Sequence, residues 1–407
     1  AMDCVENARE LKKLSGNPIL VARANLAIAE ICLVLEKKEE AEKQLSSARR
    51  IAADTKSSLL LFLCDLVEAC ILLASGEREK AALCLERGLK VGQENGILLF
   101  WWYNMDALSR LMAFALERGI EVDYARRLID AHGLRMPDQA PELEAWPWPV
   151  KIYCLGRFEI VVDGKKIGFH RKTQEKPLAL LKAILAFGGR EVSGGKLMEA
   201  LWPDSDGAVA HQALATTLHR LRHLLGVEEV IMFHQGRVTL NPELCWVDSW
   251  ALERTLGQIA PHLEDKSGTG VGCIENSPRI KECLGLYKGP FLGSEDHHPW
   301  ALGTRERLRS RYIRSVQRFC FHLESGNEDS EAICWYRKAI EVDSLAEELW
   351  QGLIRCHLNL GRKADALAAY KRFRSTLAAA LGVEPSEETE KMARRITDGE
   401  YRKDKTV

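Results

Sequence analysis

The chain has 407 residues, of which 46% are hydrophobic and 28% are charged, and its formal net charge is −1. This composition is that of ordinary globular domains, with room for roughly two to four of them, and the overall charge gives no argument for nucleic-acid binding. The longest apolar runs fall short of the roughly 18 residues that cross a bilayer, and no export signal is visible. We therefore expect a cytoplasmic protein without a membrane partner.

The twelve cysteines stand singly, and none forms the C-x-x-C pair of a structural zinc site. Most fall within apolar helical patterns, where a reduced cysteine packs as a small hydrophobic residue. The stretches CFH (Cys320 to His322) and DHHP (Asp296 to Pro299) hold pairs of potential metal ligands, but we expect neither to bind a metal. We predict no metal and no cofactor.

Helical patterning dominates the N-terminal part, from Asn25 to about Ala131, with apolar residues at three- and four-residue spacing. The pattern repeats, because Glu36 to Ala52 and Gly76 to Gly92 match in register, 40 residues apart. Each of these units is a polar turn followed by an amphipathic helix, and another apolar helix precedes each. Such repeated helix pairs predict a tetratricopeptide-like solenoid over residues 1–145.

Four prolines between His132 and Val150 end this region and mark a domain boundary. The stretch VKIYCLGRFEIVVDGKKIGF then alternates polar and apolar residues, which predicts strands joined by a hairpin turn at Asp163-Gly164. A helical segment, TQEKPLALLKAILAFGG, follows. Farther along, EVIMFHQGRVTLNPE predicts a second hairpin, turning at Gln235-Gly236.

Between the hairpins lies GGREVSGGKLMEALWPDSD, whose glycines and lysine suggest a phosphate-binding loop. A P-loop requires glycine where this chain has Arg190 and a hydroxyl residue where it has Leu197, so that interpretation fails. The alternative is a short helix capped by Ser193 and ended by the next proline. A turn with Asp206 as a second cap then leads into a longer helix.

The longer helix, which begins near Asp206, combines an apolar stripe with a basic and polar face. No acidic residue occurs between Gly207 and Gly226. Two helices joined by a turn and followed by a hairpin predict a winged helix-turn-helix over residues 146–248. The stripe expected to be buried comprises Ala210, Leu214, Leu218, Leu221 and Leu225. The face expected to point outward carries Gln212, Thr216, Thr217, His219, Arg220, Arg222 and His223.

This outward face suits double-stranded DNA. Arg220 and Arg222 can bridge phosphates or bind guanine edges, and Gln212 can pair with adenine. Thr216 and Thr217 are short enough to bring the helix backbone close to the bases. The alternative is that a basic helix face is merely solvated, but the order of strands, helices and hairpin favours DNA.

Three residues outside this helix complete the predicted interface. Lys196 and Trp202, beside the turn, would face the sugar–phosphate backbone, and Arg237 in the second hairpin could enter the minor groove. Trp202 could equally belong to the core, since tryptophan can bury its ring and still offer its N–H group. We expect His211, His223 and His234 at the solvated surface or in packing.

Helical patterning returns from Trp250 onward. The stretch SGTGVGCIENSP (Ser267 to Pro278) interrupts it and is expected to be a loop, because its glycines follow no strand. Two later units align Ala332 with Ala366, 34 residues apart, which is the tetratricopeptide period. We predict a second helical domain over residues 249–400 and a tail over 401–407. The expected fold is therefore mainly α: a TPR-like solenoid, an α+β winged helix and a second all-α TPR-like domain.

Several stretches resemble, in order, the OmpR/PhoB-type winged helix of the Streptomyces antibiotic regulatory protein (SARP) family: LGRFEIVVDG, LLKAILAFGGREVSGGKLMEALWPD, ALATTLHRLRHLLG and VDSW. LGLYKGPFL, WALGTRERLRSRY and the run from Ala339 to Thr389 resemble the bacterial transcriptional activator domain (BTAD) that follows it in that family. The match extends from about Val150 to Ile396. The N-terminal repeats are similar to the solenoid of MalT-like regulators, in which an NTPase module lies upstream.

The resemblance implies DNA binding by the helix around Thr217 to Arg222 and transcription activation through contact with RNA polymerase. It also implies that the helical activator domain packs beside the winged helix. His219 occupies a position that is often arginine, and the wing HQGRVTL lacks the glycine–tyrosine pair usual in the family. Residues that fall where the broader fold places backbone or base contacts are Trp202, Thr217, Arg220, Arg222 and Arg237.

We therefore expect a transcription activator, not an enzyme, with promoter DNA and RNA polymerase as partners. No Walker motif is present, and Ala1-Met2 resembles a cloning remnant, so we expect a piece of a longer regulator with an upstream NTPase module. The chain could form a homo-oligomer, and its helical domains could mask the recognition helix. The alternative is an interaction scaffold without sequence-specific DNA binding. ILLFWWYNMD (Ile97 to Asp106) would then supply a peptide surface, although such a cluster also suits a core.

Overall fold

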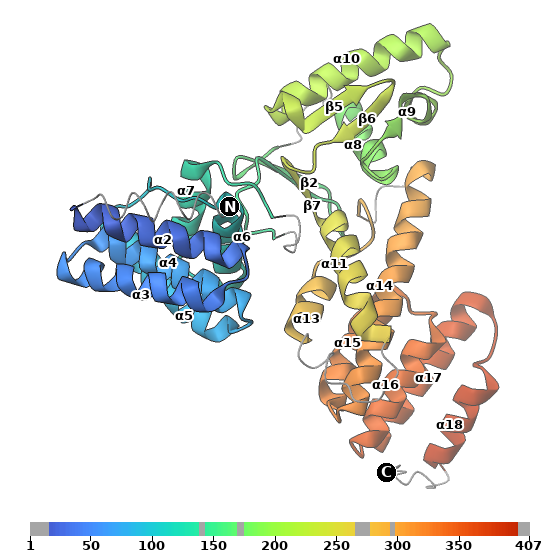
Figure 1. The fold of residues 1–407 in the computed structure, drawn as a ribbon. Coiled ribbons are helices and arrows are strands. Elements are labelled where there is room, and N and C mark those ends of the chain that lie inside the picture. Colours follow the sequence, from blue (N-terminus) through green and yellow to red (C-terminus); the bar gives the residue numbers. More distant parts are fainter. Residues whose placement is uncertain (1–15, 138–142, 169–174, 265–276, 294–297, 398–407) are drawn as a thin grey trace. The chain divides into compact units, whose positions relative to one another are not determined.

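The computed structural model describes residues 16–137, 143–168, 175–264, 277–293 and 298–397. The chain divides after Trp148 into two compact units, within the proline-rich stretch (Figure 1). The finer three-domain boundaries stay a prediction. Ala1-Met2, the tail, most of the Ser267–Pro278 stretch and the first two residues of DHHP lie outside the described residues.

The first unit is a stack of helix pairs. These are α2 (Pro18–Val34) with α3 (Lys38–Asp54), α4 (Ser58–Ala74) with α5 (Arg78–Glu94), and α6 (Met105–Arg118) with α7 (Val122–His132). The first four helices have 17 residues each, and equivalent ones start 40 residues apart. Ala41 and Ala81, which are equivalent, are fully buried, because only a small side chain lets paired helices approach closely. The predicted solenoid is confirmed.

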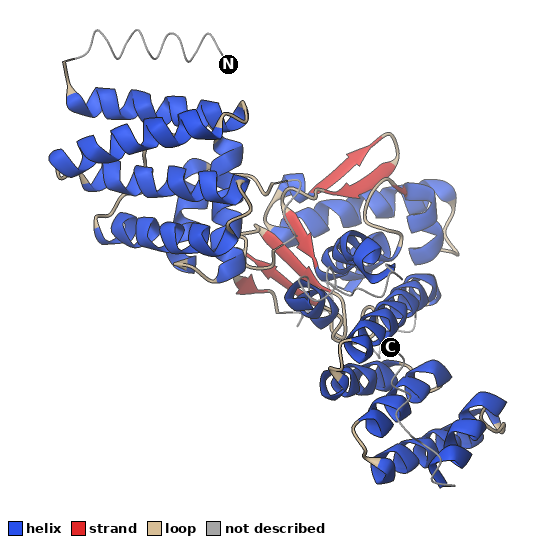
Figure 2. Cartoon of the chain, turned by 60° about the horizontal axis from the view of Figure 1, so that its bottom comes forward, coloured by secondary structure: helices blue, strands red, loops and turns tan. Residues whose placement is uncertain are grey.

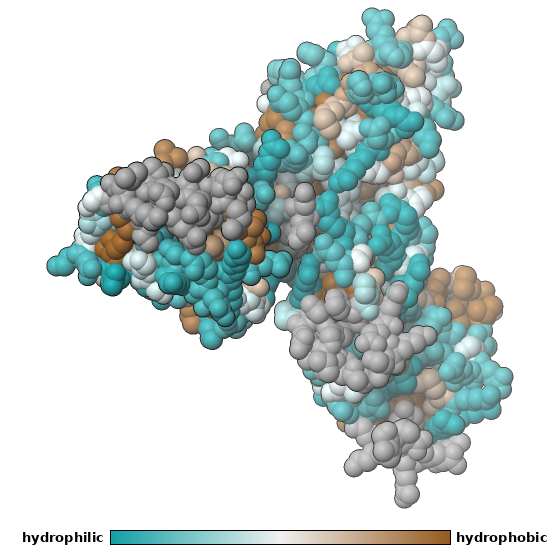
Figure 3. Space-filling model, viewed as in Figure 1, coloured by the Kyte–Doolittle hydropathy of each residue, from teal (hydrophilic) through white to brown (hydrophobic). Residues whose placement is uncertain are grey.

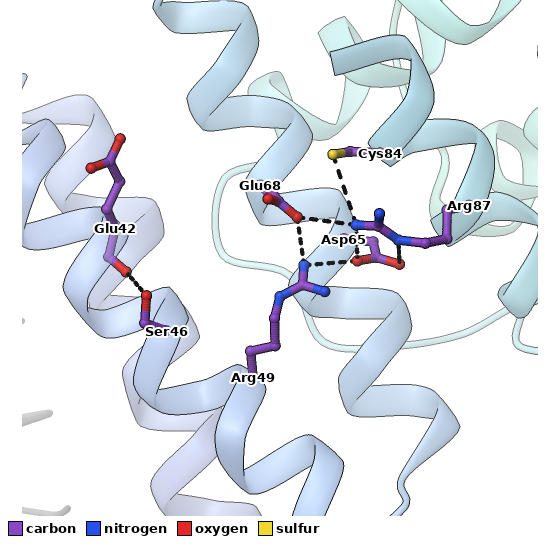
Figure 4. A network of polar contacts seen from close by, with 7 residues as sticks. All are labelled: Glu42, Ser46, Arg49, Asp65, Glu68, Cys84 and Arg87. Carbon is purple, nitrogen blue, oxygen red and sulfur yellow. Dashed lines mark hydrogen bonds and ion pairs between the residues drawn. The ribbon is translucent and has the colours of Figure 1, made fainter. Parts of the chain in front are cut away.

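A charged network ties α4 to its two neighbours in this unit (Figure 4). The carboxylate of Asp65, buried on α4, accepts hydrogen bonds from Arg49 of α3 at 2.7 Å and from Arg87 of α5 at 3.0 and 2.8 Å. Glu68, one turn farther along α4, accepts from the same two guanidinium groups at 2.6 and 3.1 Å. A buried carboxylate is tolerated here because two cations compensate for its lost hydration.

The second unit opens with a small sheet of order β3-β2-β1-β7. Its strands are β1 (Val150–Tyr153), β2 (Glu159–Val162), β3 (Lys165–Lys166) and β7 (Cys245–Val247), with β7 parallel to β1. The predicted turn between β2 and β3 is confirmed, since Asp163 and Gly164 have φ angles of 46° and 75°. Such a pair of left-handed residues matches the twist of a two-residue hairpin.

The winged helix is completed by α8 (Glu175–Ala186), α9 (Gly194–Leu201), α10 (Gly207–Leu225) and a second sheet of order β4-β6-β5. That sheet comprises β4 (Val192–Ser193), β5 (Ile231–His234) and β6 (Arg237–Leu240), and a 3-10 turn, η2 (Glu228–Val230), precedes β5. The expected wing turn is present at Gln235 and Gly236, with φ angles of 48° and 74°. Figure 2 shows the two sheets as separate groups of strands among the helices.

The rest of the second unit is helical. Ala332 and Ala366, the aligned alanines of the two repeats, are both fully buried. Hydrophilic residues cover most of the face of this unit that Figure 3 shows, as expected for amphipathic helices with a shared core. The helices are α11 (Asp248–Glu264), α13 (Ser277–Gly285), α14 (Pro299–Ser325), α15 (Asp329–Val342), α16 (Glu347–Asn359), α17 (Lys363–Leu381) and α18 (Glu387–Thr397).

Winged helix and helical domain share one hydrophobic core. The buried carboxylate of Asp248, at the start of α11, accepts hydrogen bonds from the backbone N–H groups of Cys154 and Leu155 at 2.9 and 3.0 Å. In a second contact, the hydroxyl of Thr304 in α14 donates to the carbonyl of Ala186 at the end of α8 at 2.7 Å. The winged helix is therefore fixed to the helical domain just after β1 and at the end of α8.

No helix in the described residues is long and apolar enough to span a membrane. Within the same residues, no group of three or more histidine, cysteine, aspartate or glutamate side chains could hold a metal ion. The thiol of Cys320, in the CFH stretch, is buried and lies 3.7 Å from the carbonyl of Ala332.

Candidate nucleic-acid interface

Helix α10 presents a polar face to solvent. The predicted apolar stripe is buried in full, from Ala210 to Leu225, and packs on α8 and α9. Gln212, Thr216 and His219 are exposed and follow one another at intervals of four and three residues, so they share one side of the helix. Arg220 is exposed beside them. Its guanidinium has no hydrogen bond or ion pair with the described residues, so it is available for a ligand.

Two residues expected on this face lie elsewhere. Thr217 is only 6% exposed, and its hydroxyl donates to the carbonyl of Ala213 at 2.7 Å. It lies three residues after Leu214 and four before Leu221, so helical periodicity places it within the buried stripe. The prediction that Thr217 points outward is therefore wrong.

Arg222 is half-buried, and its guanidinium is already in use. Its Nε and one terminal nitrogen donate to the carbonyl of Ile231 at 3.1 and 3.0 Å. This contact joins the last turns of α10 to the first residue of the wing. Arg222 thus differs from the expectation of a free outward arginine and instead positions the hairpin.

The N-termini of α9 and α10 are capped differently from the expectation. Ser193 and Asp206 do occupy the N-cap positions of α9 and α10, but neither side chain makes a capping hydrogen bond. The N–H group of Gly194 is instead bonded to the carbonyl of Gly236 at 2.8 Å. A side chain at position 194 would crowd that carbonyl, since its Cβ would lie at 3.0 Å from the oxygen. The wing therefore caps the first helix of the motif.

A second cationic position lies beside the turn. Lys196 is exposed on α9, and Trp202 is half-buried against the core, between the two predicted alternatives. The ammonium of Lys176, in the first turn of α8, lies 5.6 Å from the centre of the Trp202 ring and donates to the carbonyl of Leu201 at 3.3 Å. Lys176 was not among the predicted interface residues, because nothing in its local sequence indicates that α8 begins next to Trp202.

Arg237 is exposed at the start of β6, next to the wing turn. It is not free, however: its guanidinium donates to the carbonyl of Glu191 at 3.1 Å and lies 3.8 Å from that residue's carboxylate. Exposed ion pairs contribute little stability, so a phosphate can compete for this arginine. The histidines expected at the surface, His211, His223 and His234, are all exposed.

Part of this chain is similar to known transcriptional regulators. Residues 274–397 match the family model of the bacterial transcriptional activator domain. The regulatory protein AfsR of Streptomyces griseus is 31% identical over 266 residues, which are 65% of this chain and 26% of AfsR. The regulatory protein EmbR of Mycobacterium tuberculosis (strain H37Rv) is 24% identical over 265 residues, 60% of this chain and 62% of EmbR.

The chain carries a bacterial transcriptional activator domain and is homologous to the SARP-type regulators AfsR and EmbR. It spans about a quarter of the length of AfsR. A solved structure of Mycobacterium tuberculosis EmbR in complex with a low-affinity phosphopeptide covers 62% of this chain, with 21% identity and a TM-score of 0.49; the chain covers 66% of it. The predicted resemblance is confirmed at the level of the family, while the roles of individual residues stay predictions.

Proposed function

We propose that this chain binds promoter DNA through α10 and activates transcription by contacting RNA polymerase. The observation that carries the proposal is the exposed face of α10, with Gln212, Thr216, His219 and Arg220 unobstructed and no acidic residue along the helix. A helix of this kind fits the major groove, where side-chain amides and guanidinium groups distinguish base pairs. Homology to transcriptional regulators supports the same function.

The contacts divide into two kinds. Arg220 and Gln212 are proposed to read bases, with Thr216 and His219 beside them. We propose that the backbone phosphates are bound by Lys196, Lys176 and the indole N–H group of Trp202. Such contacts position the protein without specifying sequence. The structure gives Arg222 and Thr217 internal partners, so we assign them supporting roles. Arg237 is proposed to leave Glu191 for a phosphate.

The test is selection of DNA from a random pool by the full chain. We expect enrichment of a defined sequence, and we expect Arg220→Ala and Gln212→Ala to relax the preference at separate positions of that sequence. His211→Ala is the matched control. His211 is exposed on the same helix, but it directly precedes Gln212 and therefore points away from this face. Enrichment that is the same for all four proteins would contradict the assignment of α10.

An interaction scaffold without sequence-specific DNA binding is the second candidate. It is favoured by the stack of helix pairs in the first unit, an architecture that presents extended binding surfaces. If the full chain enriches no DNA sequence, this candidate replaces the activator. Homo-oligomer formation and an upstream NTPase module remain proposals that sedimentation of the chain and the sequence of the complete gene would test.

A further inference from the structure

A non-helical segment interrupts the repeat pattern of the first unit. Because α2 and α4 start at residues 18 and 58, the 40-residue period would start the third helix of this series at residue 98. Helix α6 instead begins at Met105, and Ile97–Asn104 has no regular secondary structure. Two side chains of α7, Tyr124 and His132, contact the backbone carbonyls of the first two residues of this segment, Ile97 and Leu98. This stretch replaces the first two turns of the expected helix.

The other end of the segment is held by Glu30 of α2, 73 residues before Tyr103 in the chain. The carboxylate of Glu30 accepts hydrogen bonds from the consecutive N–H groups of Tyr103 and Asn104 at 3.1 and 3.2 Å, both through the same oxygen. About two helical turns before Glu30, the guanidinium of Arg23 lies 4.7 Å from the centre of the Trp101 ring. Two side chains of α2 thus hold two consecutive N–H groups of a non-helical segment and an aromatic ring, as they would hold a bound peptide.

Glu30 retains binding capacity that the segment does not use. The residue is 4% exposed, and its second oxygen has no hydrogen-bond partner among the described residues. Burial raises the pKa of this carboxyl to about 7, although the two backbone N–H groups oppose the rise. A buried polar atom without a partner is costly. We infer that a peptide bound in place of the segment could donate a hydrogen bond to this second oxygen of Glu30.

Equivalent positions of the three repeats converge on this region. Glu30, Cys70 and Arg110 follow one another at the 40-residue period, on α2, α4 and α6. Burial is the main cause that raises the pKa of the Cys70 thiol; the charge of Glu30 raises this pKa further and that of Arg110 lowers it, so both charges act on this thiol. Arg110 is exposed. The wall formed by these helices therefore offers an acid for N–H groups and a guanidinium for a carbonyl or carboxylate, which together match a peptide backbone.

The segment fills this region incompletely. Trp102 is buried, but the side chains of Leu99 and Tyr103 are 76% and 59% exposed. Large apolar side chains gain little from such positions, since the favourable free energy depends on the area removed from water. The segment is held instead by the buried Trp102, by the ring contact of Phe100 with Phe62 and by the two hydrogen bonds to Glu30, while Leu99 and Tyr103 contribute little.

We propose that α2, α4 and α6 form a site for a non-helical, aromatic peptide segment, that Ile97–Asn104 occupies it as a built-in substitute, and that a partner protein with such a segment binds by displacing it. Glu30 is the residue that holds either occupant. This site of the first unit would then be closed until a partner protein supplies a segment that competes with Ile97–Asn104.

The experiment uses a fluorescein-labelled synthetic peptide of residues 97–106 with a solubilising lysine tail. Its binding is measured to the intact chain and to a chain in which residues 97–104 are replaced by glycine and serine. We expect at least tenfold tighter binding to the replaced chain. We also expect at least a tenfold loss when Glu30→Ala is added or when the Tyr103 and Asn104 nitrogens of the peptide are methylated. Equal binding to both chains, or no binding to a folded replaced chain, would overturn the proposal.

A second measurement keeps the test decisive if the replaced chain does not fold. Hydrogen exchange of the Tyr103 and Asn104 amides is compared in the intact chain and in the Glu30→Ala and Glu30→Gln variants. We expect at least tenfold faster exchange in Glu30→Ala, confined to the segment, and a smaller change in Glu30→Gln, whose amide oxygen can still accept. Exchange that is unchanged, or that accelerates equally throughout helices α2 to α7, would show the segment to be a permanent part of the core.

Discussion

Truncation of two arginines of α10, Arg220 and Arg222, should have different effects on the stability of the wing. Arg222 donates two hydrogen bonds to the Ile231 carbonyl, whereas Arg220 is exposed without a partner in the described residues. A hydrogen bond to a charged group contributes about 1.5–3 kcal/mol, and the half-exposure of Arg222 favours the lower end. We therefore expect Arg222→Ala to destabilise the attachment of the wing by about 1.5 kcal/mol. Arg220→Ala should change it by less than about 0.5 kcal/mol.

The assay is hydrogen exchange of the β5 and β6 amides, because a chain of two units need not unfold in one step. A loss of about 1.5 kcal/mol corresponds to roughly tenfold faster exchange in these strands. Arg222→Lys, which can restore one bond to the carbonyl, should fall between Arg222→Ala and the unchanged chain. Equal exchange in Arg220→Ala and Arg222→Ala would refute the structural role of Arg222.

Three further predictions concern stability. Asp65→Ala should lower the free energy of unfolding of the first unit by about 2–3 kcal/mol in chemical denaturation, because it leaves two partly buried guanidinium groups without this partner. Glu68→Ala, at the more exposed position, should lower it by about 1 kcal/mol or less. Similar losses for the two variants would contradict the network described above. Gly189→Ala should destabilise the second unit by more than about 2 kcal/mol, since the residue has a φ of 76° and its Cβ would overlap the Trp250 ring; an unchanged melting temperature would contradict this. Because burial raises the pKa of Glu30 from its usual 4.5 to about 7, its folded carboxyl holds a proton more tightly than the unfolded one, so its contribution is fully present below about pH 4.5 and is lost as pH rises to about 7. The stability difference between the unchanged chain and Glu30→Gln should shift by up to about 3 kcal/mol over this range; a pH-independent difference would show that the carboxyl is not buried.

Periodicity predicts what repeats in this chain, and misses what depends on a distant partner. The 40-residue period placed the helix pairs of the first unit correctly, and the apolar spacing from Ala210 to Leu225 gave the buried face of α10. Applied strictly, the same spacing also places Thr217 on the buried face of α10, because it lies three residues after Leu214 and four before Leu221. Arg222 could not be placed, because its partner is a backbone carbonyl of a later strand. Likewise, Ser193 and Asp206 look like caps in sequence, but neither side chain caps its helix in the structure. At α9 the carbonyl of Gly236 in the wing binds the first N–H group instead.

The contacts of the segment Ile97–Asn104 could likewise not be predicted from local sequence. The aromatic cluster was visible in sequence as either core or binding surface, and the structure makes it partly each: Trp102 is buried while Tyr103 is exposed. No local signal connects it with Glu30, since the two are more than 70 residues apart and only the folding of the solenoid brings them together.

The central claim, that α10 binds DNA, is tested most directly by the salt dependence of binding. Fluorescence anisotropy of a labelled fragment carrying the selected sequence would be measured at several salt concentrations for the full chain, Arg220→Ala and the control His211→Ala. Each phosphate contact contributes about 0.9 to the slope of log affinity against log salt. We predict salt-dependent binding that His211→Ala preserves, while Arg220→Ala either lowers the slope by about 0.9 or loses the preference for the selected sequence over a scrambled one. Binding without salt dependence, or identical behaviour of all three proteins, would contradict the assignment of α10 as the DNA-reading helix.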